Sequence, residues 1–185
     1  RLVDADPLEA LALKANLSFF YPKANVKILN EFVNKKNINN LVFGDQISKK
    51  IDFFSLDVDG NDYWLLKELN LTNVSVICCE YNHWLGIDKK ISMKYDPHLN
   101  FNFLDNGIFG ASLLAINEIL NSKKFHLIAV ESSGTNAFFV NEEYKKNFEI
   151  ISPKNSYQSV GRFYSKKRKE EIFNNVSSSK LLLEV

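Results

Sequence analysis

Apolar positions along the chain follow two periods, one typical of buried strands and one typical of amphipathic helices. The apolar runs predict strands at residues 1–5, 26–33, 51–58, 74–80, 125–131 and 136–140. Helical spacing predicts a helix that starts at Asp6-Pro7, a short one through 38–42, and longer ones over 61–69 and 112–124. The runs at 51–58 and 74–80 are nearly continuous in apolar residues, which predicts strands buried on both faces, as in a parallel sheet.

The order of these elements predicts the fold class. Strands alternate with helices, and the last two strands are separated only by the short turn Ser132–Thr135. This order predicts an α/β fold in three layers, with a mostly parallel sheet and a C-terminal antiparallel hairpin. Residues 81–106 show no clear period, and loops of that length are usually functional or mobile. We interpret the run Lys166–Lys169, in the polar segment 141–185, as the solvated face of a terminal helix.

Composition narrows the class of protein. The 185 residues are 45% apolar and 24% charged, which is typical of one globular domain. The net charge of +1 provides no overall field for nucleic acid or an anionic membrane, and no apolar run reaches the roughly 18 residues of a membrane span. Cys78 and Cys79 are adjacent on a predicted strand, so their side chains point to opposite faces and a disulfide between them is not expected. Two buried thiols suit a reducing compartment, so we predict a cytoplasmic protein without nucleic-acid or membrane partners.

Polar side chains end nearly every predicted strand. In an α/β fold, ligands bind at the carboxyl ends of the strands, so we expect these side chains to surround one cleft. The residues are Asp4, Asn30, Glu31, Asp57, Asp59, Glu80 and Asn82. Each of them alone is equally well explained as a turn or helix-cap residue, but a carboxylate or amide at nearly every strand end favours a site.

The stretch FFSLDVDGNDYWLLKEL, residues 53–69, admits two interpretations from its Asp-x-Asp pattern alone. In a phosphatase of the haloacid-dehalogenase type, Asp57 would be the nucleophile and Asp59 the acid or base. Asn61 replaces the hydroxyl residue expected there, and two strands precede this one instead of none. In a nucleotide-sugar transferase, the same pair would hold a divalent metal against a diphosphate.

A third interpretation covers residues 2–140. The stretch resembles the FkbM-type family of S-adenosylmethionine-dependent methyltransferases, in which an apolar strand ends in D-x-[DE]-G before a Leu-rich helix. Other segments resemble the same family, in particular a subgroup with the phrase DGNDYW: LVDADP (2–7), CCEYN (78–82), YDP (95–97), FGASLLAIN (109–117) and SSGTNAFFV (132–140). The resemblance implies a Rossmann-like methyltransferase fold and an O-methyltransferase acting on a sugar or glycan.

The resemblance also implies roles for the strand-end residues. Asp4 matches the carboxylate that accepts hydrogen bonds from the ribose of S-adenosylmethionine, and Glu31 lies where the adenine side would be. Asp57 would face the methyl group or the acceptor hydroxyl, and Asp59 would join it in catalysis or in holding a divalent metal. Glu80 and Asn82, on the next strand, would bind the acceptor.

The expected glycine-rich turn after the first strand of this fold is missing, because none of the seven glycines forms a GxG turn near Arg1. We therefore expect the first strand to be missing as well. We also expect this chain alone to bind the donor weakly or not at all. The sequence then divides into a partial methyltransferase domain, 1–140, and an extension, 141–185.

Several alternatives stay open. One is a degenerate Rossmann-type domain that binds without catalysing. His126 is expected to be structural, whereas His83 and His98 in the long loop are candidates for a general base. The loop aromatics form either a surface that stacks on a sugar or a set of anchors to the core. They are Trp84, Tyr95 and Phe101.

Overall fold

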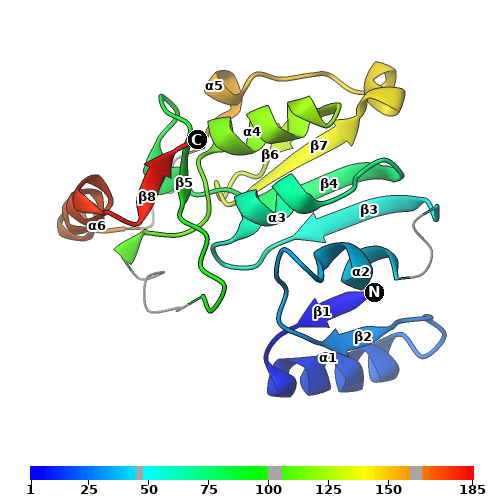
Figure 1. Cartoon of the computed structure of the whole chain (residues 1–185). Coiled ribbons are helices and arrows are strands. Elements are labelled where there is room, and N and C mark those ends of the chain that lie inside the picture. The colour runs from blue at the N-terminus through cyan, green and yellow to red at the C-terminus, as the bar shows by residue number, and fades with distance from the viewer. Residues whose placement is uncertain (45–47, 100–105, 159–163) are drawn as a thin grey trace. The chain divides into compact units, whose positions relative to one another are not determined.

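The computed structural model describes residues 1–44, 48–99, 106–158 and 164–185 (Figure 1). Phe101 and the rest of 100–105 lie outside the described residues, as do 45–47 and 159–163. The chain forms two compact units, Arg1–Ile47 and Ser48–Val185, and each is described by itself below. We call them the N-terminal and C-terminal units.

The N-terminal unit is a small α/β element. It contains β1 (Leu2–Asp4), α1 (Pro7–Phe20), β2 (Ile28–Asn30) and α2 (Ile38–Phe43). The two strands pair in parallel over three residues each, so β2 is shorter than the strand predicted at 26–33. The predicted cap of α1 is confirmed, because Asp6 accepts hydrogen bonds from the backbone N–H of Leu8 at 2.7 Å and of Glu9 at 3.3 Å.

The C-terminal unit is built on a four-stranded sheet in the order β3-β4-β7-β6. Its strands are β3 (Ile51–Leu56), β4 (Val74–Glu80), β6 (Phe125–Val130) and β7 (Asn136–Asn141). Only β3 and β4 are parallel, whereas β7 runs antiparallel to both of its neighbours. The α/β class and the C-terminal hairpin are confirmed, and the sheet of this unit is mixed, with β7 as its one reversed strand.

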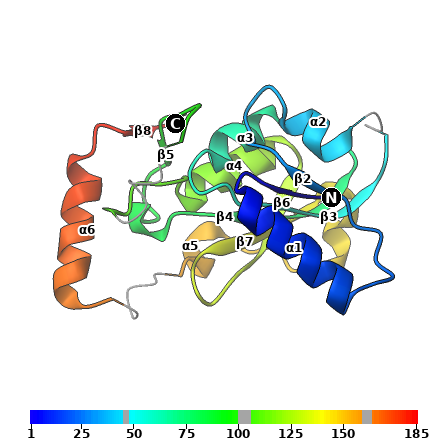
Figure 2. The same ribbon diagram turned by 90° about the horizontal axis from the view of Figure 1, so that it is seen from below.

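Two helices cover one face of this sheet. They are α3 (Asp62–Glu68) and α4 (Leu113–Ser122), which lie side by side in Figure 2. Their apolar side chains and those of β4 and β7 form the core, and the fully buried ones include Leu65, Leu66, Ile77, Ile116 and Phe139. Burial of such side chains is the main contribution to the stability of this unit.

Burial on both faces is predicted correctly for β4 and wrongly for β3. The side chains of β4 are buried or half-buried throughout. On β3 only Leu56 is buried, and Phe53 is 56% exposed. The reason is the position in the sheet: among the described strands β3 pairs only with β4, so it is an edge strand, and its apolar composition does not reveal that.

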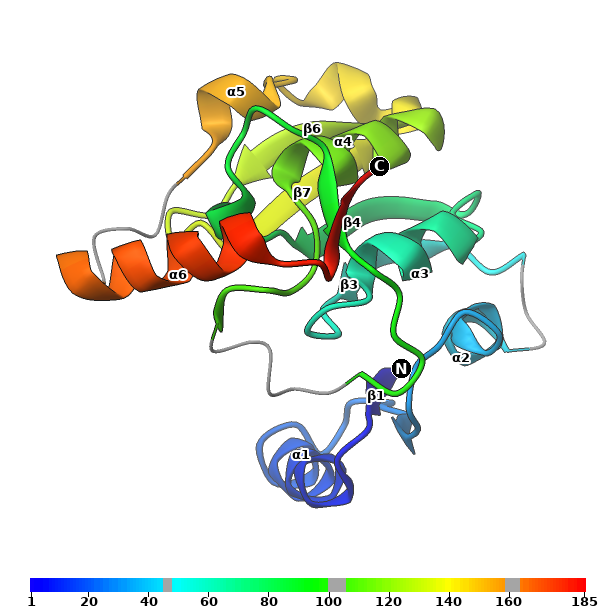
Figure 3. The same cartoon turned by 60° about the vertical axis from the view of Figure 1, so that its left-hand side comes forward.

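The long segment after β4 is held by the end of the chain. It contains the 3-10 turn η1 (His83–Leu85) and β5 (Ile91–Met93), and β5 pairs antiparallel with β8 (Leu182–Glu184), as Figure 3 shows. The remaining elements of residues 141–185 are η3 (Glu142–Asn147), α5 (Pro153–Ser156) and α6 (Lys166–Ser178). From this segment, Val176 and Leu182 pack against the buried cluster of Met93, Leu99 and Ile108. The C-terminal segment is thus integral to the C-terminal unit, and the predicted terminal helix is α6.

No helix in the described parts of the chain is long and apolar enough to cross a membrane.

Candidate functional site

The turn between β3 and α3 carries the first candidate residues. Its backbone is unusual for an L-residue at Asp59, with φ of 54°, and it continues through Gly60 at φ of 155°. Asp62, which is completely buried, holds the turn by accepting hydrogen bonds from the backbone N–H of Val58 at 3.1 Å and of Gly60 at 3.0 Å. The turn therefore presents Asp57 and Asp59 on a backbone that a neighbouring side chain fixes in place.

Asn61 and Trp64, which follow this turn, anchor the long loop 81–106. Asn61 donates to the carbonyl oxygen of Asp96 at 2.7 Å and accepts from its N–H at 3.1 Å. The indole N–H of Trp64 donates to the carbonyl oxygen of Met93 at 2.7 Å. Two segments that carry the family resemblance, DGNDYW and YDP, are thus bonded to each other across 35 residues of chain.

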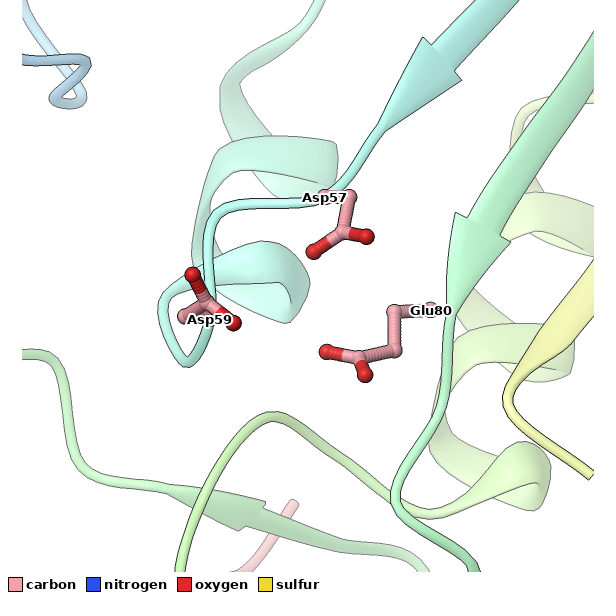
Figure 4. Close-up of side chains that lie close together, drawn as sticks. All are labelled: Asp57, Asp59 and Glu80. Atoms are coloured by element: carbon pink, nitrogen blue, oxygen red, sulfur yellow. The ribbon is translucent and has the colours of Figure 1, made fainter. Parts of the chain in front are cut away.

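Three carboxylates meet at the carboxyl ends of β3 and β4. Leu56 pairs with Cys79 in parallel register, so the next residue of each strand, Asp57 and Glu80, emerges at the same edge. Asp59 approaches from the turn, and one carboxylate oxygen from each of the three residues lies within 4.8 Å of the others (Figure 4). Both aspartates are exposed and Glu80 is half-buried, so the group opens to solvent on one side.

Burial and charge change the protonation of Glu80. Burial is the main cause that raises its pKa to about 8, and the carboxylates of Asp57, Asp62 and Asp59 add to the rise. Its Oε2 atom is buried and has no hydrogen-bond partner among the described residues. Burial likewise raises the pKa of Asp62 to about 7, against the effect of its two backbone donors. Near neutral pH Glu80 is therefore mainly a carboxylic acid, which can donate a hydrogen bond.

Asn82, two residues after Glu80, is an anchor of the loop. It is 0% exposed, and its amide donates to the carbonyl oxygens of Gly107 at 2.9 Å and Phe109 at 2.8 Å. Its side-chain oxygen accepts from the N–H of Trp84 at 2.8 Å. These bonds use both amide hydrogens, so the structure shows a structural role for Asn82. A catalytic role for this residue stays a prediction.

Two of the three predicted donor-binding residues, Asp4 and Glu31, lie in the N-terminal unit, and the third, Asp57, lies in the C-terminal unit. Asp4 ends β1 and Glu31 follows β2, and the N–H of Glu31 donates to the carbonyl oxygen of Asp4 at 3.0 Å. Asn30 also uses its amide locally, donating to the carbonyl oxygens of Asp4 and Ala5. Asp4 and Glu31 therefore stand next to each other at one edge of that unit, and their role toward a donor remains a prediction.

The histidines have distinct environments. His126 bonds to Glu142, which agrees with a structural role. His98 is exposed in the loop. His83 is 7% exposed, and neither ring nitrogen has a hydrogen-bond partner among the described residues. Burial lowers its pKa to about 4, and the nearby backbone of Gly134 only partly opposes this shift. At neutral pH His83 is therefore uncharged, and its low pKa makes it a weak base.

Of the loop aromatics, Trp84 serves as an anchor. It packs edge-to-face on Tyr164 and on Phe173, with ring centroids 5.1 and 5.7 Å apart. Asn136, the first residue of β7, donates to Glu131 at 2.9 Å and so stabilises the turn of the hairpin. Neither residue lies free at the strand ends.

No family model matches this chain, and neither a curated protein nor a solved structure matches it. The three carboxylates are capable of several kinds of chemistry. They can accept hydrogen bonds from hydroxyl groups, take up a proton, or provide oxygen ligands to a divalent cation.

Proposed function

We propose that this chain belongs to an S-adenosylmethionine-dependent O-methyltransferase that acts on a hydroxyl group of a sugar or glycan. The observation that carries the proposal is the meeting of Asp57, Asp59 and Glu80 at the carboxyl ends of two adjacent parallel strands. That edge is where open α/β sheets bind their ligands. The sugar acceptor follows from the family resemblance.

The contacts between the resembling segments support this proposal. DGNDYW bonds to YDP through Asn61, and CCEYN bonds to the FGAS segment through Asn82. Ser112 of FGAS caps α4 by accepting from the N–H of Ala115. These segments are far apart in the sequence, yet they contact one another near the carboxyl ends of β3 and β4. This proximity supports a common function for them.

Each of the three carboxyl groups has a separate role in the proposed reaction. S-adenosylmethionine would supply an electrophilic methyl group on a sulfonium. As the acceptor oxygen forms its bond to the methyl carbon and the carbon–sulfur bond breaks, the hydroxyl proton has to leave, and the exposed Asp57 carboxylate takes it. Glu80, protonated near neutral pH, donates a hydrogen bond that orients the acceptor. Asp59 accepts from a neighbouring hydroxyl of the sugar. On the family resemblance alone, we assign Asp4 and Glu31 of the N-terminal unit to the ribose and adenine of the donor.

The test is donor binding and methyl transfer by the full product of the gene, measured by calorimetry and with radiolabelled S-adenosylmethionine. Asp4→Asn is expected to weaken donor binding by about tenfold or more, because a neutral amide replaces a charged acceptor. Asp57→Asn is expected to lower methyl transfer to glycan acceptors by about a hundredfold while leaving donor affinity within about threefold.

Asp52→Asn is the matched control, since Asp52 is an exposed carboxylate on the same strand β3. It is expected to leave both binding and transfer unchanged. Absence of saturable donor binding by the full gene product would contradict the proposal.

The proximity of the three carboxylates also favours a second function. Asp57, Asp59 and Glu80 would hold a magnesium or manganese ion in a metal-dependent phosphatase or nucleotide-sugar transferase. Activity that requires the metal and consumes no S-adenosylmethionine would support this second function over the first. Metal-dependent methyl transfer would instead support the first function, with the three carboxylates as ligands of the metal.

A further inference from the structure

A cavity on the helical side of the C-terminal unit lies apart from the three carboxylates. Its volume is about 220 Å³, and α3 and α4, the two adjacent helices in Figure 1, provide most of its walls. The lining residues are Tyr63, Lys67, Lys90, Ala115, Glu118, Ile119, Ser122 and Val185. A space of this size accommodates a molecule smaller than a typical drug-sized ligand.

The charges that line the cavity are not balanced. Lys90 pairs with Glu118 at 2.5 Å. Lys67 lies over the ring of Trp64, 5.7 Å from its centroid, and forms no ion pair with a carboxylate among the described residues. Among the side chains that line the cavity, two lysines and one glutamate leave one positive charge, and the unpaired Lys67 ammonium group favours a ligand with a single negative charge.

Tyr63 offers a hydrogen-bond donor to the same space. The residue is only 9% exposed, and its ring packs edge-to-face on Trp64 at 5.2 Å. Its hydroxyl has no hydrogen-bond partner within the described part of the chain, and its oxygen is not fully enclosed, so it opens on the cavity. Burial raises the pKa of Tyr63, which keeps the hydroxyl protonated. The hydroxyl is therefore free to donate a hydrogen bond to a molecule that enters the cavity.

We propose that this cavity binds a small monocarboxylate with a short apolar tail. The carboxylate accepts hydrogen bonds from the Tyr63 hydroxyl and the Lys67 ammonium group. The tail lies against Ala115 and Ile119, which form the apolar part of the wall. This site is separate from the strand-end carboxylates and does not depend on the function proposed for them.

The test is an NMR titration of the chain with butanoate as the probe. We expect saturable shifts of the backbone amides of Lys67, Ala115 and Ile119, with a Kd on the order of 1 mM. Lys67→Met is expected to weaken binding by about tenfold, and Tyr63→Phe by about fivefold. Lys67 is exposed, so its replacement leaves the fold intact, and the spectrum of each variant verifies this directly.

Three comparisons make the test decisive. Lys154→Met, an exposed lysine on α5, is the matched control and is expected to bind butanoate normally. Butanamide, which has the same shape without the charge, is expected not to bind. Equal binding of butanamide, unchanged affinity in Lys67→Met, absence of saturable shifts at the cavity, or tighter binding of methyl phosphate would each overturn the proposal.

Discussion

Replacing Asn82 by alanine is expected to lower the free energy of unfolding of the C-terminal unit by about 3 kcal/mol. The change removes three hydrogen bonds and leaves the carbonyl oxygens of Gly107 and Phe109 without that donor. The side chain is 0% exposed, so water cannot replace it without opening the loop. Urea unfolding followed by circular dichroism measures the change.

The matched control is Asn174→Ala, an exposed asparagine on α6, which is expected to change the free energy of unfolding by less than about 0.5 kcal/mol. The pair also separates two roles for Asn82. If Asn82 served only in catalysis, Asn82→Ala would lose activity with its unfolding midpoint unchanged, and that result would contradict the structural role.

The sequence predicts best the strand whose side chains are buried or half-buried throughout. Val74–Glu80 is predicted with its observed ends, because an apolar run enclosed on both faces has a composition that only a buried strand needs. For β3 the same reasoning fails, since exposure of Phe53 depends on which strand lies next to it. A single sequence contains the composition of a strand but not the number of its neighbours.

Within the candidate site, the carboxylates at the strand ends are brought together as the topology predicts. Asp57 and Glu80 follow adjacent residues of a parallel pair, so their proximity follows from register alone. Asn61 and Asp62 were not predicted as site-building residues, because at a helix start they are explained equally well as local caps. Only the partner of Asn61, Asp96, reveals its role, and that partner lies 35 residues away.

The conformation of the long loop could not be predicted from the sequence, for a related reason. Asn61, Trp64 and Asn82 hold it through hydrogen bonds from side chains to backbone atoms. Such bonds depend on the position of a carbonyl group and not on the identity of the residue that carries it. They therefore leave no period in the sequence of the loop.

The pH dependence of stability gives a prediction of similar size. The pKa of Glu80 is about 8 in the folded chain, against an ordinary value of 4.5. The folded state therefore binds a proton that the unfolded state has lost, and stability falls as pH rises through this interval. The loss from this residue is expected to be about 2 kcal/mol between pH 6 and pH 8. Urea unfolding at several pH values measures it.

Glu80→Gln removes the titrating group while keeping its shape, so its stability is expected to fall less steeply above about pH 6. Asp62, whose pKa is raised to about 7, keeps a slope of the same sign in this variant. His83 acts in the opposite direction, because its lowered pKa costs stability as pH falls from 6.5 toward 4, and measurements above about pH 6 exclude most of that effect. Glu149→Gln, an exposed carboxylate in the same unit, is the control and should follow the parent chain. Parallel curves for Glu80→Gln and the parent would mean that Glu80 is ionised in the folded state, and Glu80 could then not be the hydrogen-bond donor of the proposed reaction.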